Sequence, residues 1–319
     1  MSDTRPKLLV LVGPTAVGKT ALSLALAERF NCEIISGDSM QVYRGMDIGT
    51  AKASQEERQA VPHHLIDILE PEESFSVSDF QALTRGTIHE VQERGRLPFL
   101  VGGTGLYVES VCYNYEFSEA ESDEAFRSEM HHRAEQEGND ALHQELAAVD
   151  PVTAAKLHPN DVRRVIRALE VYKLTGQTMS DQLSRQNKRP HYDLCLIGLT
   201  MDRAILYNRI EERVDQMMRE GLLDEVKRLI QRGLPMHSVA LQALGYKEFL
   251  DYFGGNCSLE DAIARLKQDT RRFAKRQLSW FRHMKDIDWI DVTDEQKKVQ
   301  QFEVISGIIA EKLSLHGHE

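Results

Sequence analysis

The sequence contains little cysteine and no long hydrophobic run. Its four cysteines, Cys32, Cys112, Cys195 and Cys257, are scattered and include no C-x-x-C pair and no histidine at metal-ligand spacing. This pattern excludes a disulfide framework and a cysteine-based zinc site, and it predicts free thiols in a reducing compartment. The apolar run 8–12 is far shorter than the roughly 20 residues that cross a bilayer, and residues 1–7 show no signal-peptide pattern. We therefore expect a cytoplasmic protein with no membrane span.

Positive charge is also scarce. The formal net charge is −11, which argues against a protein whose whole surface binds nucleic acid, although it leaves room for a local basic groove. Hydrophobic residues make up 41% and charged residues 28% of the chain, as in an ordinary globular protein. A length of 319 residues suits two domains, or one domain with a large insertion.

Short apolar runs predict four buried strands of a parallel sheet. These runs cover Lys7–Val12, 33–36, 98–101 and Asp193–Thr200. Helical patterns at 20–30 and 80–94 lie between them. Strands that alternate with helices predict an α/β core with a parallel sheet flanked by helices.

Between about residues 115 and 190 the strand signals disappear. Charged and helix-forming residues dominate 123–137 and 141–149, and Asn160 or Asp161 can cap a helix that ends near Gly176. The apolar stripe of that helix consists of Val162, Val165, Ile166 and Leu169. We predict that 1–114 form the first part of the core, 115–190 an all-helical insertion, and 191–319 the rest of the core with a helical C-terminal region.

A phosphate-binding motif follows the first strand. Gly13-Pro14-Thr15-Ala16-Val17-Gly18-Lys19-Thr20 matches G-x-x-x-x-G-K-[ST] and opens a helix, as a P-loop does. We expect this loop to bind a diphosphate or a nucleotide through its backbone N–H groups and the helix N-terminus. Lys19 can reach the terminal phosphate, and the Thr20 hydroxyl can ligate Mg²⁺. The fold predicted is thus a P-loop NTPase-like sheet with a helical insertion.

The motif does not by itself specify ATP, because a diphosphate ester suits the same loop. In P-loop ATPases and GTPases a second apolar strand usually ends in an aspartate that helps to hold Mg²⁺. The strand 98–101 instead ends in Gly102-Gly103-Thr104. This disfavours a motor or a switch and leaves kinase-like and other group transferases.

Two polar residues follow the neighbouring strands. Asp38 comes after the second strand and Thr104 after the third, and ligands of an open α/β sheet lie at this carboxyl edge of the strands. Both residues are therefore expected to face the phosphate ligand, where the carboxylate can accept a proton from an attacking nucleophile. The alternative is that Asp38 only stabilises a turn and Thr104 only bonds the backbone.

Together these motifs resemble the tRNA dimethylallyltransferase (tRNA isopentenyltransferase) family. Apart from the loop 13–20, the resemblance is carried, in the family's order, by Asp38-Ser39-Met40-Gln41-Val42-Tyr43, Gly102-Gly103-Thr104-Gly105-Leu106-Tyr107, His158-Pro159-Asn160-Asp161, Arg167-Ala168-Leu169-Glu170-Val171, Leu244-Gly245-Tyr246-Lys247-Glu248 and Lys275-Arg276-Gln277-Leu278-Ser279-Trp280. It covers nearly the whole chain, and residues 112–149 carry little of it.

The resemblance implies a prenyltransferase that modifies transfer RNA. Such an enzyme moves a dimethylallyl group from dimethylallyl diphosphate to N6 of the adenosine 3′ of the anticodon, position 37, with the help of Mg²⁺, and gives N6-isopentenyladenosine. By resemblance, residues 13–20 hold the diphosphate, Asp38 is the general base and Thr104 lies beside the amine or the donor. The partners implied are the anticodon stem-loop of tRNA and the donor, and we expect a monomer.

A further cation is expected to stabilise the leaving diphosphate together with Lys19. Arg209, Arg213 and Arg219 lie on a predicted helix that flanks the site, and Arg213 is favoured as a catalytic residue. The alternative for each arginine is a solvated helix face with internal ion pairs.

The clearest basic segment is 265–285, with a local net charge of +7 against the −11 of the chain. Its cations are Arg265, Lys267, Arg271, Arg272, Lys275, Arg276, Arg282 and Lys285. Aromatic residues recur there at helical spacing, which predicts an amphipathic helix whose basic face neutralises RNA phosphates. Smaller basic stretches hold Arg163, Arg164 and Arg167, and Arg185, Lys188, Arg189 and His191.

By motif and by resemblance, we expect RNA contacts from five parts of the chain. The residues are Asp38, Ser39, Met40, Gln41, Thr104, Arg163, Arg164, Val165, Ile166, Arg167, Gln242, Ala243, Leu244, Gly245, Tyr246, Lys247, Lys275, Arg276, Gln277, Leu278, Ser279, Trp280, Phe281 and Arg282. Gln41 is hypothesised to read the flipped adenine through its amide.

Two other functions stay open at this point. One is a small-molecule P-loop kinase that uses ATP, with the insertion as a lid, and it leaves the basic segment 265–285 unexplained. The other is a nucleotide-dependent RNA-binding switch, which the missing strand-end aspartate disfavours.

Overall fold

The computed structural model describes residues 5–113, 115–117, 123–186 and 189–315, and it divides the chain into two compact units. One unit comprises residues 1–113 and 190–319 and is called the core unit here. The other, residues 114–189, is called the insertion unit. In the described part of the chain no helix is both long and apolar enough to span a membrane.

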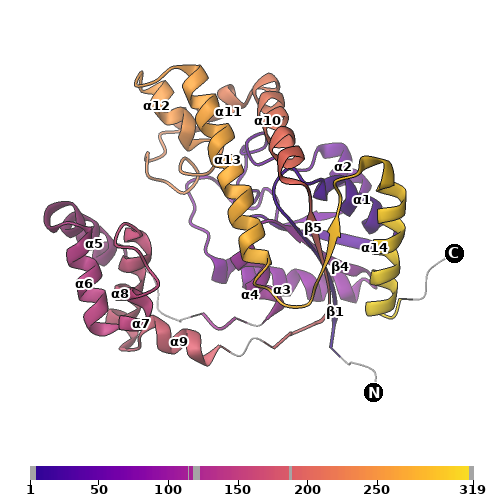
Figure 1. Cartoon of the computed structure of the whole chain (residues 1–319), viewed down its shortest axis with the longest axis horizontal. Helices are drawn as coiled ribbons and strands as arrows, with labels where there is room; N and C mark the ends of the chain where they lie inside the picture. The colour runs from indigo at the N-terminus through magenta and orange to yellow at the C-terminus, as the bar shows by residue number, and fades with distance from the viewer. Residues whose placement is uncertain (1–4, 114, 118–122, 187–188, 316–319) are drawn as a thin grey trace. The chain divides into compact units, whose positions relative to one another are not determined.

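A six-stranded parallel sheet forms the centre of the core unit (Figure 1). Its strands lie in the order β3-β2-β4-β1-β5-β6. The bounds are β1 Lys7–Val12, β2 Cys32–Gly37, β3 His63–His64, β4 Leu97–Gly102, β5 Asp193–Thr200 and β6 Ile287–Asp291. The order places β1 between β4 and β5. Because these strands are parallel, the loops after β1, β2 and β4 emerge at the same edge of the sheet.

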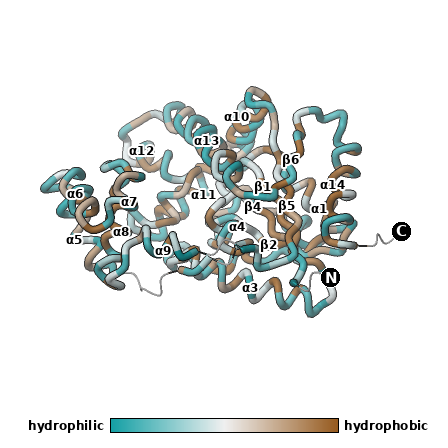
Figure 2. Tube along the Cα trace, turned by 60° about the horizontal axis from the view of Figure 1, so that its bottom comes forward, coloured by the Kyte–Doolittle hydropathy of each residue, from teal (hydrophilic) through white to brown (hydrophobic). Residues whose placement is uncertain are grey.

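Helices cover both faces of this sheet. The helices of the whole core unit are α1 Lys19–Arg29, α2 Gln55–Ala60, α3 Val77–Glu93, α4 Gly105–Cys112, α10 Arg203–Glu220, α11 Leu222–Gln231, α12 Leu250–Phe253, α13 Leu259–Phe281 and α14 Lys298–Lys312, with short 3₁₀ turns at Lys247–Phe249 and Glu295–Lys297. Alternate residues of β1 enter different cores: Leu9 and Leu11 pack with α1, α10 and α14, whereas Leu8 and Val10 pack with α3 and α4. Figure 2 shows the resulting hydrophobic colouring of the central strands.

A third apolar cluster lies outside the sheet. It joins Val42, Tyr43 and Met46, from the segment after β2, to α10, α11 and the first half of α13. This cluster fixes the segment that follows Asp38 and Gln41 against α10, the helix that carries Arg213. The site is thus held by packing as well as by loop hydrogen bonds.

The insertion unit is entirely helical where it is described. Its helices are α5 Glu124–Glu137, α6 Asn139–Val149, α7 Pro151–Ala154, α8 Val162–Thr175 and α9 Met179–Arg185. The stripe predicted on α8 is largely buried with Met130 and Leu146 in a core of its own. Gly176 ends α8 at φ 67°, as predicted, and Asp161 is the N-cap residue but makes no side-chain capping hydrogen bond.

The four predicted strands are confirmed within one residue of their predicted ends, and two strands were missed. β3 has only two residues, both histidines, and β6 is partly exposed along most of its length. Neither segment has the continuous apolar run by which the buried strands were recognised.

Candidate active site

The phosphate loop connects β1 to α1 at the carboxyl edge of the sheet. Its backbone takes left-handed values at Ala16, φ 65°, and Gly18, φ 104°, and only glycine adopts the latter without strain. The ammonium of Lys19 donates to the carbonyls of Gly13 at 2.9 Å and Pro14 at 2.8 Å. Lys19 therefore lies across the loop, where a bound diphosphate can accept its hydrogen bonds.

Lys19 has an unusual proton affinity. Burial and, to a smaller extent, the positive charge of Arg213 lower the pKa of Lys19 to about 7, while the carboxylate of Asp38 opposes the change. A bound polyanion stabilises the ammonium and raises this pKa again. The loop is thus an anion site whose affinity depends on the proton that Lys19 carries.

Not every loop amide points at the phosphate position. The N–H of Thr15 donates to Oε1 of Gln277 at 2.9 Å, so this amide is already paired inside the protein. The Thr15 N–H is therefore not available to a ligand in this arrangement, and the binding of the diphosphate by residues 13–20 stays a prediction. The Thr20 side chain, at the start of α1, is exposed and open to a ligand.

Asp38 follows β2, as predicted, and is held by a tight turn. Its Oδ1 accepts hydrogen bonds from the N–H groups of Met40 at 2.8 Å and Gln41 at 3.4 Å. Burial raises the pKa of Asp38, while these two N–H groups and the charges of Lys19 and Arg213 oppose the rise. The carboxylate is thus fixed at one oxygen and has an increased affinity for a proton, as a general base requires.

Thr104 and Asp38 belong to loops that are fastened to each other. The N–H of Thr104 donates to the Gly37 carbonyl at 3.3 Å, and Oγ1 of Thr104 accepts from the N–H of Ser39 at 3.3 Å. A Cβ on Gly102 would lie 2.3 Å from the Gly37 carbonyl oxygen, so glycine is required where β2 and β4 approach. This explains the Gly102-Gly103 pair, which the sequence showed without a reason.

Of the three candidate arginines, only Arg213 interacts with the site. Arg209 forms an ion pair with Glu295, and Arg219 is exposed and bonded to Gln216. Arg213 is partly buried, its charge acts on both Lys19 and Asp38, and burial lowers its pKa. A cavity of about 550 Å³ adjoins Arg213 and is lined also by residues 47–58.

Gln41, the proposed reader of adenine, is engaged within the protein. Its Oε1 accepts from the Ser36 hydroxyl at 2.8 Å, and its Nε2 donates to the carbonyls of Thr50 at 3.1 Å and Ala51 at 3.4 Å. In this arrangement neither end of the amide is free for a base. The amide instead ties the Asp38 turn to the segment 46–52.

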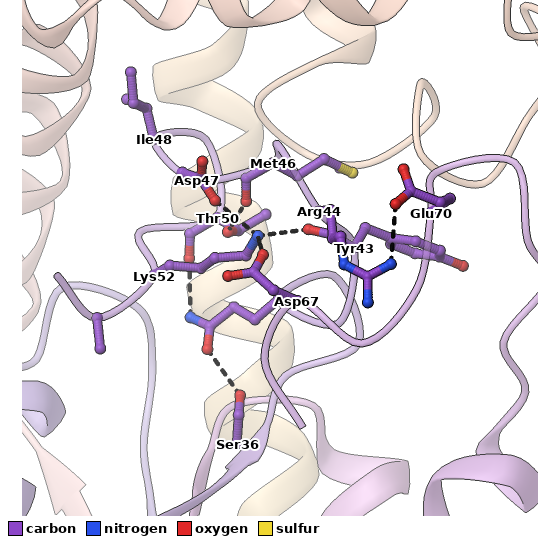
Figure 3. Close-up of polar contacts among 12 residues, drawn as sticks. Ser36, Tyr43, Arg44, Met46, Asp47, Ile48, Thr50, Lys52, Asp67 and Glu70 are labelled. Atoms are coloured by element: carbon purple, nitrogen blue, oxygen red, sulfur yellow. Dashed lines mark hydrogen bonds and ion pairs between the residues drawn. The ribbon is translucent and has the colours of Figure 1, made fainter. Parts of the chain in front are cut away.

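The buried ammonium of Lys52 holds the segment 46–52 in place. The ammonium of Lys52 donates to the Tyr43 carbonyl at 2.5 Å and to the carboxylates of Asp47 at 2.8 Å and Asp67 at 2.5 Å, as Figure 3 shows. Asp67 also pairs with Arg58 at 2.6 Å. All three ammonium protons of Lys52 are used, so its role is to shape the loop.

Glu225, which no sequence motif marked, connects the segment 47–49 to Tyr246. This buried carboxylate accepts from the N–H groups of Asp47, Ile48 and Gly49 at 2.9–3.0 Å and from the Tyr246 hydroxyl at 2.7 Å. Tyr246 itself is fully buried. Its place in the motif is thus explained by packing, whereas the neighbouring Lys247 is exposed and forms ion pairs with Glu248 at 3.7 Å and Asp269 at 3.8 Å.

Ala243 and Gly245 are buried as well, and Leu244 is partly buried. Gln242 is partly exposed and donates to the Met236 carbonyl at 2.8 Å.

The basic helix α13 has two different halves. In its first half Arg265, Lys267, Arg271 and Arg272 form ion pairs with Asp251, Asp215, Glu211 and Asp269. Lys275, Arg276, Arg282 and Lys285 are exposed, and none has an ion pair among the described residues. Part of the local net charge of +7 is therefore neutralised by ion pairs within the protein. The cations without an ion pair lie toward and just beyond the C-terminal end of α13.

The remaining residues of the 275–282 motif differ in exposure. Gln277 and Phe281 are buried, and Leu278 is partly buried, whereas Ser279 and Trp280 are exposed. The Trp280 indole N–H donates to Glu109 at 3.0 Å, and its ring lies against Gly105, where a Cβ would be 2.3 Å away. These contacts fasten α13 to the start of α4, directly after Thr104.

The predicted basic residues of the insertion unit also differ in their exposure and ion pairing. Arg163 and Arg164 are exposed, Val165 and Ile166 are in the core, and Arg167 pairs with the buried Glu170 at 2.7 Å. Arg185 is exposed and bonds Gln177 at 3.2 Å, Arg189 is exposed, and Lys188 lies outside the described residues; His191, which belongs to the core unit, is also exposed. Among the described residues no cluster of three or more His, Cys, Asp or Glu side chains could hold a metal ion.

The parallel sheet with a glycine-lysine phosphate loop at its carboxyl edge defines an α/β protein of the P-loop type. A family model described as IPP transferase matches residues 41–284, and one described as isopentenyl transferase matches residues 6–68. The chain belongs to the tRNA dimethylallyltransferase family, whose members are prenyltransferases.

Individual relatives agree along nearly the whole chain. The tRNA dimethylallyltransferase of Geobacillus thermodenitrificans (strain NG80-2) is 54% identical over 312 residues, which are 98% of this chain and 99% of that protein. That of Bacillus subtilis (strain 168) is 54% identical over 311 residues, 96% of this chain and 99% of that one.

Solved structures give the same result. The full-length tRNA isopentenylpyrophosphate transferase from Bacillus halodurans is 52% identical with a TM-score of 0.72, over 98% of this chain and 99% of that one. A eukaryotic dimethylallyltransferase crystallised acting on tRNA is 31% identical with a TM-score of 0.82, over 98% of this chain and 81% of that one. None of these relatives supports the kinase alternative or the RNA-binding switch.

Proposed function

We propose that this enzyme transfers the dimethylallyl group of dimethylallyl diphosphate to N6 of the adenosine at position 37 of tRNA, next to the anticodon. The relatives named above are dimethylallyltransferases of tRNA by name. The observation that carries the assignment of roles is that Lys19 lies across the phosphate loop after β1, while Asp38 and Thr104 follow β2 and β4 at the same edge of the sheet, in loops that hydrogen-bond to each other.

The reaction needs an anion site and a base on either side of the allylic carbon. N6 of adenine attacks C1 of the dimethylallyl group, the C1–O bond breaks, and diphosphate leaves with the electron pair. Lys19, the loop amides and Arg213 stabilise the charge that develops on the diphosphate. Asp38 accepts the proton that N6 loses, and its turn through Met40 keeps the carboxylate oriented for this transfer.

Thr104 lies on the acceptor side of this arrangement. Its hydroxyl is fixed by the Ser39 N–H, and the two loops that carry Asp38 and Thr104 are joined through Gly37. We infer that Thr104 holds the amine or the donor in line with Asp38. Correct alignment of two reacting groups accounts for a large part of the rate of such transfers.

The residues at the loop fit Mg²⁺ as the cofactor. The exposed Thr20 side chain carries one oxygen ligand, and the described residues contain no carboxylate cluster that would form a separate metal site. Thr20 would thus hold the ion together with the diphosphate oxygens, as in other P-loop sites. Bound there, Mg²⁺ supplies positive charge to the leaving diphosphate.

For the RNA, we infer that the free cations of α13 bind the phosphates of the anticodon stem-loop. Lys275, Arg276 and Arg282 are exposed without ion pairs in the described chain, and the same helix touches Gly103 and Gly105 beside Thr104. Arg163 and Arg164 of the insertion are exposed and suited to phosphates as well. Since the acceptor is tRNA, we further propose that the enzyme is cytoplasmic, and we propose that it acts as a monomer.

The test is a direct assay of the product. Unmodified tRNA with adenosine at position 37 is incubated with the protein, Mg²⁺ and dimethylallyl diphosphate, and its nucleosides are analysed by mass spectrometry. We expect isopentenyladenosine, none with ATP in place of the donor, and none on a tRNA with guanosine at position 37. Absence of the product from the wild-type reaction would overturn the proposal.

A further inference from the structure

The side chain of Gln277 connects the two loops that form the site. Its Oε1 accepts from the N–H of Thr15 in the phosphate loop at 2.9 Å, and its Nε2 donates to the carbonyl of Gly103 at 3.0 Å. Gln277 comes from α13, 262 residues from Thr15 along the chain, and is only 6% exposed. One buried amide thus spans the gap between the donor loop and the loop of Thr104.

Only a side chain with one acceptor and one donor at this spacing makes both bonds. The Thr15 N–H needs an acceptor and the Gly103 carbonyl needs a donor, and the amide of glutamine offers one of each. The ionised carboxylate of glutamate places an acceptor against the Gly103 carbonyl, and methionine makes neither bond. Glycine at position 103 leaves room for this side chain, because a Cβ there would lie 2.2 Å from Nε2 of Gln277.

The helix around Gln277 is a rigid support for this bridge. Ala274 and Phe281, on the same face of α13, are fully buried, and Trp280 fastens the helix to Glu109 of α4. Gln277 is therefore not placed to reach RNA, in contrast to Lys275 and Arg276, which are exposed. Its two bonds act on the backbone of both substrate loops.

We propose that Gln277 is a positioning residue that sets the phosphate loop at a fixed distance from the Thr104 loop and orients Thr15 so that the remaining loop amides face the diphosphate. The inference rests on the proposed function for its substrates. It assigns Gln277 to the donor side of the reaction, where the family motif suggested RNA contact. Loss of the bridge weakens donor binding and leaves RNA binding intact.

The experiment compares Gln277→Glu and Gln277→Met with the matched control Gln268→Glu, an exposed glutamine on the same helix. Isothermal titration with inorganic diphosphate and Mg²⁺ gives donor-site affinity, and filter binding of the tRNA anticodon stem-loop without donor gives RNA affinity. We expect a loss of diphosphate affinity of roughly tenfold in Gln277→Met, since a buried N–H and carbonyl lose their partners. RNA affinity stays within about twofold of wild type, and Gln268→Glu behaves as wild type.

A pH series separates positioning from a general loss of structure. A protonated glutamate has a donor and an acceptor like the amide, so diphosphate affinity of Gln277→Glu, relative to wild type at each pH, recovers as pH falls from 8 to 5.5. Gln277→Met shows no such recovery. KM for the donor rises more than KM for tRNA in steady-state assays of both variants.

The proposal is overturned if diphosphate affinity is unchanged in both variants, or if RNA affinity falls instead. It is also overturned if Gln277→Glu shows no recovery at low pH. Circular dichroism verifies that each variant is folded at the temperature used, and Gly103→Ala, which displaces the amide from the other side, must give the same loss of diphosphate affinity. These binding measurements do not depend on prenyl transfer, so a failure of the proposed function is detected separately in the product assay.

Discussion

The free cations of α13 predict a specific salt dependence of RNA binding. Lys275, Arg276 and Arg282 are exposed and have no ion pair in the described chain, so each can release counterions from an RNA phosphate. Each such contact contributes about 0.7–0.9 to the slope of log K against log salt. Replacing all three by glutamine is therefore expected to reduce the slope by roughly 2–3.

The magnitude is large enough to measure directly. Raising the salt from 50 to 200 mM should therefore weaken RNA binding by this triple variant roughly 20- to 40-fold less than it weakens RNA binding by the wild type. Filter binding of the anticodon stem-loop over a KCl series gives both slopes. The control replaces Lys267, Arg271 and Arg272 by glutamine, which changes the net charge equally but removes cations that are paired at 2.6–3.1 Å.

The control should keep nearly the wild-type slope, because its cations already neutralise acids of the protein. The reasoning is refuted if the two triple variants have the same slope, or if the first variant has the slope of the wild type. Either result would mean that overall charge, rather than the pairing seen on α13, determines RNA binding.

The other predictions concern single residues of the site. Arg213→Gln should lower kcat/KM for the donor by about 10²–10³, whereas Arg219→Gln, which lies outside the site, stays near wild type; equal effects in steady-state assays would contradict the choice of Arg213. Lys19 has a folded pKa of about 7 against an ordinary 10.5, so its buried charge destabilises the ligand-free protein fully below pH 7 and less as pH rises toward 10.5. The difference in Tm between Lys19→Met and the wild type should therefore be more positive at pH 6 than at pH 9. Calorimetry that shows no such trend would refute the lowered pKa of Lys19. Gln41→Ala should lower the free energy of unfolding by about 1–3 kcal/mol without RNA, because Ser36 and Thr50 lose their partner; a urea transition at the wild-type midpoint would contradict this.

The parts of the fold that the sequence revealed are those with local signals. β1 and β5 are continuous apolar runs, and the motif 13–20 joins a strand to a helix with glycines at the required places. Asp38 and Thr104 were found because both follow strands of one parallel sheet, whose carboxyl ends share an edge. β3 and β6 were missed because a two-residue pairing and a partly exposed edge strand lack that pattern.

The bonds that hold the site together were out of reach of the sequence for a different reason. Gln277 bonds Thr15 across 262 residues, and Glu225 bonds the 47–49 backbone across 176–178 residues. A glutamine or glutamate on a helix has no local feature that marks it as buried. For the same reason the sequence alone could not show that Gln41 and Tyr246 make their hydrogen bonds within the protein, whereas Lys275, Arg276 and Arg282 are exposed.

The central claim is that Asp38 accepts the proton from N6 while the loop 13–20 holds the departing diphosphate. Its most direct measurement is the single-turnover rate of prenyl transfer by Asp38→Asn, with donor and tRNA both saturating and the modified adenosine quantified by mass spectrometry. The asparagine keeps the shape of the side chain but accepts no proton, so the rate should fall by about 10²–10⁴ while both substrates still bind. A rate within a few fold of the wild type would contradict the assignment of Asp38 as the base.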